Sequence, residues 1–477
     1  MNFKMIRYII GFILIFEAIF MVIPALTALV YSEKAIWSWL ICMLICLGFG
    51  KLLTFKKPEN KTLYARDGYV IVALSWIVLS LFGSFPFIIS GAIPSFVDAL
   101  FETVSGFTTT GSSILSDVES LPKSMLMWRS FSHWVGGMGV LVFIMAFLPL
   151  SGGNNMHLMK AESTGPAVSK IVPRVKKTAF ILYTIYFSFT IVEFIILLCG
   201  GLSVFEAINI AFATAGTGGF SIYNNGLESF SPFLQIVITV FMLLFSINFS
   251  SYFLLFTGKL KEAFNCEVRY FLLIVAASVC CISINIYNMY GSIGESIRHS
   301  AFAVSSLIST TGFSTVDFDK WPELSQTILV IIMFTGSCAG STAGGIKISR
   351  IIILLKGLSK ELLNMIHPNQ VKKITIDKKA IEHETIRSVN VYIVCYLVIF
   401  IASLIVISFE DYDLITNFTA VTASLNNVGP GLAKVGPTCN FGFLSVPTKL
   451  VLIFDMLAGR LELYPMLILF NRHTWKK

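Results

Sequence analysis

The chain has 477 residues, of which 55% are hydrophobic and only 13% are charged, and its formal net charge is +8. Soluble globular domains contain about 25% charged residues, so this composition excludes that class. An apolar run of about 20 residues can cross a bilayer as a helix. The chain therefore predicts an all-α polytopic membrane protein, with spans that include 5–30, 37–55, 70–89, 180–198 and 389–407.

Basic side chains gather in alternate loops of the chain. Three clusters occupy 51–66, 170–177 and 356–387. Because loops rich in Lys and Arg stay on the cytoplasmic side, we expect all three clusters, and both chain ends, to be cytoplasmic. The clusters lack the interleaved aromatic residues of a nucleic-acid-binding domain, so no nucleic-acid partner is expected. The charge pattern instead orients the chain in the membrane.

The residue types of common catalytic and cofactor sites are not grouped in this sequence. The nine cysteines include no C-x-x-C pair, and the six histidines include no H-E-x-x-H spacing. A phosphate-binding loop is missing as well. We therefore expect no cofactor in this chain and no enzyme activity. An intramembrane enzyme, the alternative from another class, would need a converging nucleophile and base or a set of metal ligands.

One structural unit recurs four times along the chain. Each unit has a long apolar span, a short amphipathic stretch, a turn rich in Thr and Gly, and a second long span. At about 1.5 Å per residue the short stretches cannot cross the bilayer as helices, so they must enter and turn back. These stretches are 95–108, 204–215, 297–309 and 414–424. Two extra spans in 1–62 precede the repeats, which gives two plus eight spans with repeats at 63–156, 157–262, 263–370 and 371–477.

A glycine occupies the same place in all four turns that follow the short stretches. Non-helical backbone at membrane depth is tolerated only where it is buried in protein or lines a water-filled cavity. Glycine lets carbonyl groups point into such a cavity, and the negative C-terminal ends of the short helices favour a cation there. Ordinary capped loops are the alternative, but four turns in register weigh against it. The glycines are Gly111, Gly219, Gly312 and Gly429.

The span after the third turn is interrupted by small residues. The stretch 336–345 has poor helix propensity and predicts an unwound loop. Gly336, Gly340 and Gly344 also match the spacing of a helical small-residue packing face, which is the alternative. The consecutive pair Gly344 and Gly345 favours the loop.

The last span carries three charged residues, Asp455, Arg460 and Glu462. A charge near the middle of the bilayer costs about 2.5–3.5 kcal/mol, so such side chains face a partner or water. Arg460 therefore either pairs with one of the two acids or faces a pore. A proton- or sodium-coupled cation symporter that uses the two acids is the alternative function.

Three further stretches carry a family resemblance: YARDG at 64–68, RSFSHWVGGMG at 129–139 and AESTGPAVSKIVPR at 161–174. Together with the four turns, they show that the chain resembles the Trk/Ktr/HKT superfamily of potassium transporters over nearly its whole length. The two extra N-terminal spans are similar to those of its TrkH branch and are absent from the shorter Ktr subunits. The resemblance implies potassium uptake across the bacterial cytoplasmic (inner) membrane by a homodimer, gated by a cytosolic TrkA-like nucleotide-binding subunit.

The resemblance also implies roles for particular residues. The four turns would form a K+ selectivity filter, and the loop 336–345 would obstruct the pore beneath it, with Lys347 and Arg350 at its cytoplasmic end. In relatives, a serine at the first filter position accompanies sodium permeation, so Gly111 favours K+ over Na+. A pore-facing Arg460 would add an electrostatic barrier. The implied filter residues are Thr109, Thr110, Gly111, Thr217, Gly218, Gly219, Thr310, Thr311, Gly312, Asn427, Val428 and Gly429.

Overall fold

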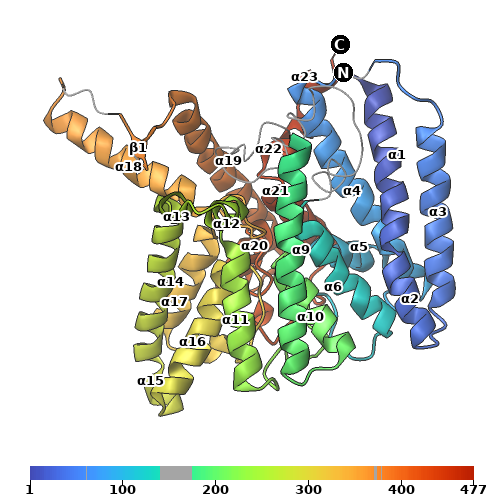
Figure 1. The fold of residues 1–477 in the computed structure, drawn as a ribbon, viewed down its shortest axis with the longest axis horizontal. Helices are drawn as coiled ribbons and strands as arrows, with labels where there is room; N and C mark the ends of the chain where they lie inside the picture. Colours follow the sequence, from blue (N-terminus) through green and yellow to red (C-terminus); the bar gives the residue numbers. More distant parts are fainter. Residues whose placement is uncertain (61, 140–174, 370–372, 378, 477) are drawn as a thin grey trace.

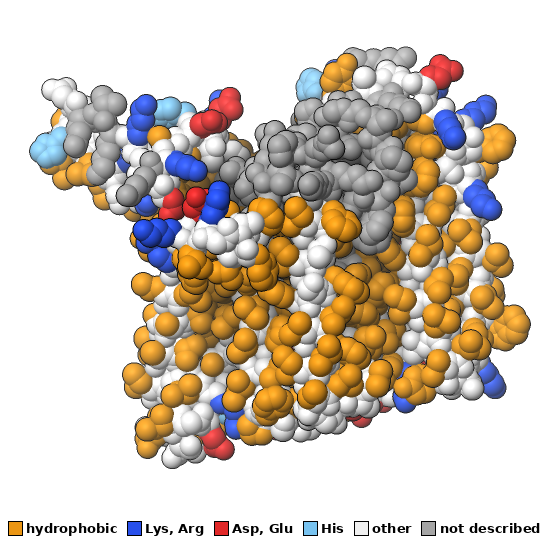
Figure 2. Space-filling model, in the orientation of Figure 1, with side chains coloured by type: hydrophobic (Ala, Val, Ile, Leu, Met, Phe, Trp, Pro, Cys, Tyr) orange, Lys and Arg blue, Asp and Glu red, His pale blue; other side chains and the backbone are white. Residues whose placement is uncertain are grey.

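The computed structural model describes residues 1–60, 62–139, 175–369, 373–377 and 379–476. The described chain is mostly helical, and its longer helices run side by side between two faces (Figure 1). Both chain ends lie at one face, which we call the terminal face (top of Figure 1). Figure 2 shows hydrophobic side chains over the band between the faces and charged side chains towards its edges. The expected all-α polytopic membrane fold is confirmed.

The two extra N-terminal spans form a hairpin beside the first repeat. α1 (Phe3–Phe20) and α2 (Val22–Val30) make one span, and α3 (Ile36–Thr54) returns along α1. A Cβ atom built on Gly50 would lie 2.9 Å from the carbonyl oxygen of Gly11, and one built on Gly11 would lie 2.9 Å from that of Gly50. Small residues at such a crossing let two helices approach closely within a membrane.

Each repeat begins with a long helix and a short re-entrant helix. The long helices are α4 (Ala65–Ile89), α9 (Val175–Cys199), α14 (Cys266–Asn285) and α19 (His383–Ile407). The re-entrant helices are α5 (Phe96–Phe107), α10 (Val204–Gly216), α16 (Ile293–Ile308) and α20 (Leu414–Leu425). Ser95, Ser203 and Asp413 accept a backbone N–H at the start of three of these helices, as N-cap residues do. The four short helices therefore occur where the sequence predicted them.

The second helix of each repeat is shorter than predicted. These helices are α6 (Lys123–Gly137), α11 (Pro232–Ser246), α17 (Glu323–Thr335) and α21 (Val446–Arg460). With 13 to 15 residues each, they extend about 20–22 Å, which is less than the ~30 Å hydrocarbon core. Among the described residues, six helices have the length and composition of a span, or seven if a bent pair counts as one. The chain that continues from α6 lies outside the described residues. The prediction of a long second span was wrong for the second and fourth repeats, whereas the interruption predicted at 336–345 of the third repeat is present.

Each described break in a second helix has a local backbone cause. α11 bends by 92° into α12 (Phe249–Phe256), because Ile247 between them is extended. α17 stops at Gly336, whose φ is +60°. α21 stops before Glu462 and Leu463, which both have positive φ. The sequence predicted the break at Gly336 from small residues of poor helix propensity, but it did not predict the breaks at Ile247 and at Glu462 and Leu463.

The terminal face carries the largest element outside the bundle. α18 (Ile348–Ile366) follows the loop after α17, projects to one side (Figure 1), and leads to a hairpin of β1 (Thr375–Ile376) with β2 (Lys379–Ala380). The described residues of the third basic cluster, 356–369, 373–377 and 379–387, lie on these elements, in the segments beside them and at the start of α19. Residues 140–174, which include the motif at 161–174 and part of the second cluster, lie outside the described residues. The remaining short helices are α13 (Leu260–Ala263), α15 (Tyr287–Tyr290), α22 (Tyr464–Phe470), α23 (Arg472–Trp475) and the 3-10 turns Phe318–Lys320, Ser408–Glu410 and Ala433–Val435.

Replacing Gly50 with Leu should destabilise the N-terminal hairpin, because the Cβ position lies 2.7 Å from Cγ1 of Ile15 in α1. We expect a loss of about 1–3 kcal/mol, as for other overpacked contacts, measured as a lower melting temperature of the detergent-solubilised protein. Gly48→Leu is the control, because a Cβ atom at Gly48 would meet no described atom within 4 Å. Equal melting temperatures for the two variants would refute the packing argument.

Candidate functional site

All four re-entrant helices end in the same left-handed turn. In each turn one residue has a φ of 54–55°, and the next residue donates its N–H to a carbonyl five residues earlier. In the first turn, Thr110 N lies 2.9 Å from Ser105 O. This is the Schellman pattern of helix ends, and it places Gly219 of the second turn in the same position as Gly111 of the first. The left-handed residues are Thr109, Thr217, Thr310 and Asn427.

The four glycines close a ring of contacts between the turns. A Cβ atom built on Gly111 would lie 2.0 Å from the carbonyl oxygen of Gly218 in the second turn. The same relation joins the second turn to the third, the third to the fourth and the fourth back to the first. The pairs are Gly219 with Thr311 O at 1.9 Å, Gly312 with Val428 O at 2.3 Å and Gly429 with Thr110 O at 2.8 Å. Since the glycines also have φ between 76° and 98°, only a residue without a side chain fits there.

Polar side chains also tie the fourth turn to the first. Asn427 donates its Nδ2 to Oγ1 of Thr110 at 2.9 Å. The hydroxyl of Ser112 donates to the carbonyl of Gly429 at 3.0 Å. Both bonds join residues 317 positions apart in the sequence. The structure therefore brings the predicted filter residues of all four repeats into one ring, in which Gly111, Gly219 and Gly312 are partly exposed and most other members are buried.

A polar cavity adjoins this ring. All four glycines line it, together with residues of the segments that follow the turns, among them Ser112, Ser221 and Asn224. Asn224 donates its Nδ2 to Asp117 at 2.9 Å, and this hydrogen bond holds the pKa of Asp117 below its usual value. An ionised carboxylate beside the cavity raises the local concentration of cations.

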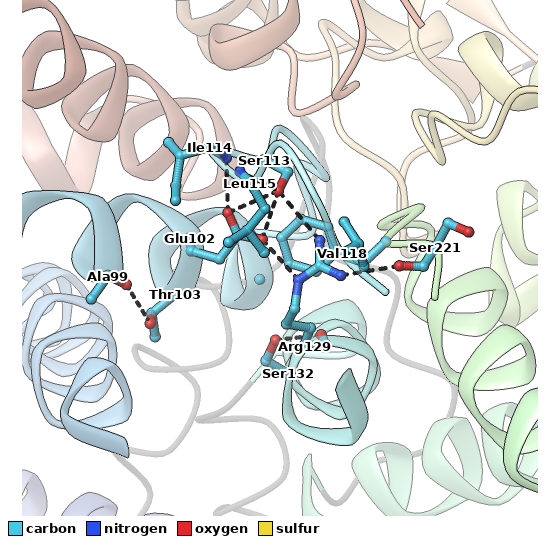
Figure 3. Close-up of polar contacts among 12 residues, drawn as sticks. Ala99, Glu102, Thr103, Ser113, Ile114, Leu115, Val118, Arg129, Ser132 and Ser221 are labelled. Atoms are coloured by element: carbon cyan, nitrogen blue, oxygen red, sulfur yellow. Dashed lines mark hydrogen bonds and ion pairs between the residues drawn. The ribbon is translucent and has the colours of Figure 1, made fainter. Parts of the chain in front are cut away.

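A buried ion pair supports the first two turns (Figure 3). Arg129 of α6 donates its Nε to Glu102 of α5 at 2.8 Å, and both side chains are almost fully buried. Glu102 also accepts the hydroxyl of Ser113 and the N–H of Ile114, each at 3.0 Å. Arg129 donates its Nη1 to the carbonyl of Ser221 at 3.0 Å. The pair therefore joins two helices of the first repeat to the segments that leave the first and second turns.

His133 makes a second link between the first two repeats. Its Nδ1 lies 2.7 Å from the carbonyl of Gly106 near the end of α5, and its Nε2 accepts the N–H of Phe220 at 3.2 Å. These partners assign a neutral ring with its proton on Nδ1. The sequence had not placed His133, Glu102 or Arg129 in the site. Isolated ionisable residues within apolar helices were the one signal that could have found them.

The chain between α17 and α18 is an unwound loop, as the sequence predicted. The alternative, in which Gly336, Gly340 and Gly344 form a packing face on a helix, is wrong, because the stretch is not helical. The loop touches the ring directly, since Gly344 donates its N–H to Oγ1 of Thr310 at 2.7 Å. A Cβ atom on Gly344 would lie 2.3 Å from the carbonyl of Asn426, just before the fourth turn. Positive φ angles, from 60° to 79°, occur at Gly336, Gly340, Gly345 and Lys347.

Arg460, the last residue of α21, connects this loop to the first repeat. Its Nη1 donates to the carbonyl of Thr342 in the loop at 2.6 Å. Its Nη2 donates to the carbonyls of Gly136 and Gly137, at the end of α6, at 2.5 and 2.7 Å. The guanidinium group is therefore held by backbone carbonyls from two repeats.

The two acids near Arg460 in the sequence have partners on other helices. Asp455 accepts the hydroxyl of Ser403 in α19 at 2.8 Å. Glu462 forms a salt bridge with Arg350 of α18. Arg350 is also stacked over the ring of Tyr392, 3.9 Å from its centroid. The two contacts of Arg350 join the last repeat to α18, the helix that follows the loop.

Four re-entrant helices that end around one polar cavity, inside a bundle of apolar helices, define a membrane transport protein. The chain belongs to the TrkH family of cation transport proteins, whose family model matches residues 38–476. It is therefore a transporter and not an enzyme.

Individual relatives match the chain over its whole length. It is 35% identical to the Trk system potassium uptake protein TrkH of Escherichia coli (strain K12), with 100% of each chain covered. It is 33% identical to the potassium uptake protein TrkG of the same organism, over 99% of each chain. The crystal structure of the potassium transporter TrkH from Vibrio parahaemolyticus matches with a TM-score of 0.90 and 32% identity over 100% of both chains.

Replacing Glu102 with Gln should destabilise the protein, because Arg129 would remain buried without its counter-charge. We expect a loss of about 3–5 kcal/mol, the usual cost of removing one partner of a buried ion pair, measured as a lower melting temperature. Glu228→Gln, at an exposed position, is the control and should melt like the unchanged protein. If Glu102→Gln also melted at the unchanged temperature, the supporting role of the pair would be refuted.

Proposed function

We propose that this chain takes up potassium ions across the bacterial cytoplasmic membrane and that the ring of turns is its selectivity filter. The observation that carries the proposal is the closed cycle in which each glycine faces a carbonyl oxygen of the next turn. Such oxygens can replace the hydration shell of K+. The names of the similar proteins from Escherichia coli and Vibrio parahaemolyticus support the choice of ion.

The electrostatics of the ring favour a cation. The four re-entrant helices end at the ring, so their negative C-terminal ends surround it. An inside-negative membrane potential adds about 2.3 kcal/mol per 100 mV for each inward charge. Uptake therefore requires no nucleotide hydrolysis by this chain.

The composition of the turns sets the expected selectivity. A potassium channel uses several consecutive carbonyl rings from identical T-V-G-Y-G loops, whereas only the glycine recurs in all four turns here. We infer fewer ordered ion sites and looser selectivity than in such a channel. The proposed K+-coordinating residues are the twelve that the sequence predicted, three from each turn.

We further propose that the loop 336–345 and Arg460 form the gate. The loop is bonded to Thr310 in the third turn and to Arg460, so it occupies the space next to the filter. A guanidinium group in the path of a cation is an electrostatic barrier. Conduction would require the loop and this charge to move aside.

The proposed partners are a second copy of the chain and a cytosolic TrkA-like nucleotide-binding subunit. The described residues of the basic cluster 356–387, which include those on α18 and the hairpin, offer a contact surface at the terminal face, which we infer to be cytoplasmic. A coupled symporter is less favoured, because the acids it would use, Asp455 and Glu462, are engaged by Ser403 and Arg350.

Replacing Gly312 with Ser should damage the filter, because its Cβ atom would lie 2.3 Å from the carbonyl of Val428. We expect K+ and Rb+ flux into liposomes carrying the purified protein to fall about tenfold, equivalent to ~1.4 kcal/mol of lost ion coordination, with weaker discrimination against Na+. Gly291→Ser is the matched control, since Gly291 has a φ of +66° but a Cβ atom there would meet no described atom within 4 Å. Equal flux through both variants would refute the filter model. Uptake that depends on a proton gradient would refute it as well.

Neutralising Arg460 should increase flux, because Arg460→Gln removes a positive charge from the proposed ion path and a bond to the loop. Arg460→Lys keeps the charge but loses the forked geometry that reaches two sets of carbonyls. We expect the Gln variant to conduct several times faster than the unchanged protein, with the Lys variant between the two. A Gln variant with unchanged or lower flux and normal melting would exclude Arg460 from the gate.

A further inference from the structure

Glu267 lies where the loop 336–345 meets the helices of the third repeat. It is the second residue of α14. Its Oε1 accepts two backbone N–H groups, from Ala339 at 2.7 Å and from Ser349 at 3.2 Å. Ala339 belongs to the loop, and Ser349 to the first turn of α18. One carboxylate oxygen therefore joins the loop and the helix that follows it to α14.

The two hydrogen bonds differ in kind from the other contacts of the loop. Within the described residues, the side chain of Lys347 forms no cap for α18. Glu267 supplies the acceptor from another helix, and its negative charge lies at the positive end of α18. Hydrogen bonds to a carboxylate are roughly twice as strong as those between neutral groups. Glu267 is therefore an anionic anchor for a loop whose other hydrogen bonds go to backbone groups, hydroxyls, Arg460 and Lys347.

The start of α14 is in turn bonded to the hairpin that follows α18. Asp377 accepts the N–H of Cys266 at 3.0 Å. Lys356 of α18 donates its Nζ to the carbonyl of Thr375 in the hairpin at 2.7 Å. A displacement of α18 or of the hairpin would therefore shift Glu267 relative to the loop it holds.

We propose that Glu267 is a positioning residue that latches the loop in its obstructing place, and that opening breaks its bonds to Ala339 and Ser349. This inference rests on the proposed function of the loop as the gate. Glu267 binds the loop and the start of α18 but none of the filter residues, while the filter turns are held by Glu102, Arg129 and the glycine contacts. Removing the latch therefore changes how often the pore is open and leaves ion selectivity unchanged.

The first test is the K+ and Rb+ flux of full-length variants in liposomes. Glu267→Ala removes both hydrogen bonds, and we expect it to raise basal flux about threefold to tenfold. Glu267→Gln keeps an oxygen acceptor without the charge, so its flux should lie between that of Glu267→Ala and the unchanged protein. Glu262→Gln, at an exposed position in α13, is the matched control and should leave flux unchanged. All variants should keep the Rb+ to Na+ flux ratio of the unchanged protein.

Cys338 supplies a second readout that does not depend on ion flux. Its side chain is fully buried in the loop, next to Ala339, so a water-soluble maleimide reaches it when the loop moves. Peptide mass spectrometry measures the modified fraction at Cys338 separately from the other cysteines. We expect labelling several times faster in Glu267→Ala than in the unchanged protein, and no change in Glu262→Gln.

The two readouts separate failure of the latch from failure of the gate. Unchanged flux together with unchanged labelling of Cys338 in Glu267→Ala would overturn the latch. Faster labelling without a rise in flux would instead overturn the loop as the gate, and with it the function on which the latch rests. If Glu267→Ala does not assemble in the membrane, Glu267→Gln, which keeps the shape of the side chain, decides the question by the same two measurements.

Discussion

The close approach of four backbone turns is the constraint on which the rest of the structure depends. Each glycine of the ring faces a carbonyl oxygen of the next turn at a distance that leaves no space for a Cβ atom. Four helices must therefore end at one place inside the membrane band, and each must be short enough to return to the face from which it entered. The long outer helices then surround these ends with apolar side chains, because exposed backbone is not tolerated in lipid.

The same constraint explains where the buried charges lie. Polar backbone inside an apolar bundle must be held by side chains whose own polar groups are also hydrogen-bonded, because unpaired polar groups are costly there. Glu102 and Arg129 neutralise each other while they bind the segments that leave the first two turns. Arg460 meets carbonyl groups of the loop and of α6, and Glu267 meets amide groups of the loop and of α18. The sign of each charge matches the backbone groups that it holds.

The loop after α17 is held by hydrogen bonds to several segments that surround it. Its bonds go to the third turn, to the break between α11 and α12, to Arg460 and to Glu267. Its Cys338 is also buried in the apolar cluster that α14 and α17 form. The four turns are joined to one another by close backbone contacts at their glycines.

The sequence by itself determined the membrane class, the four repeats, the positions of the short helices and the glycines of the turns. These features are local, because apolar length and the conformational freedom of glycine are properties of neighbouring residues. Only the tertiary structure decided which carbonyl each glycine faces, where the second helices of the second and fourth repeats break, and which partners Glu102, Arg460 and Glu267 bind. Those features depend on contacts between residues that are 317 or 324 positions apart in the sequence. A pattern of neighbouring residues does not predict such contacts.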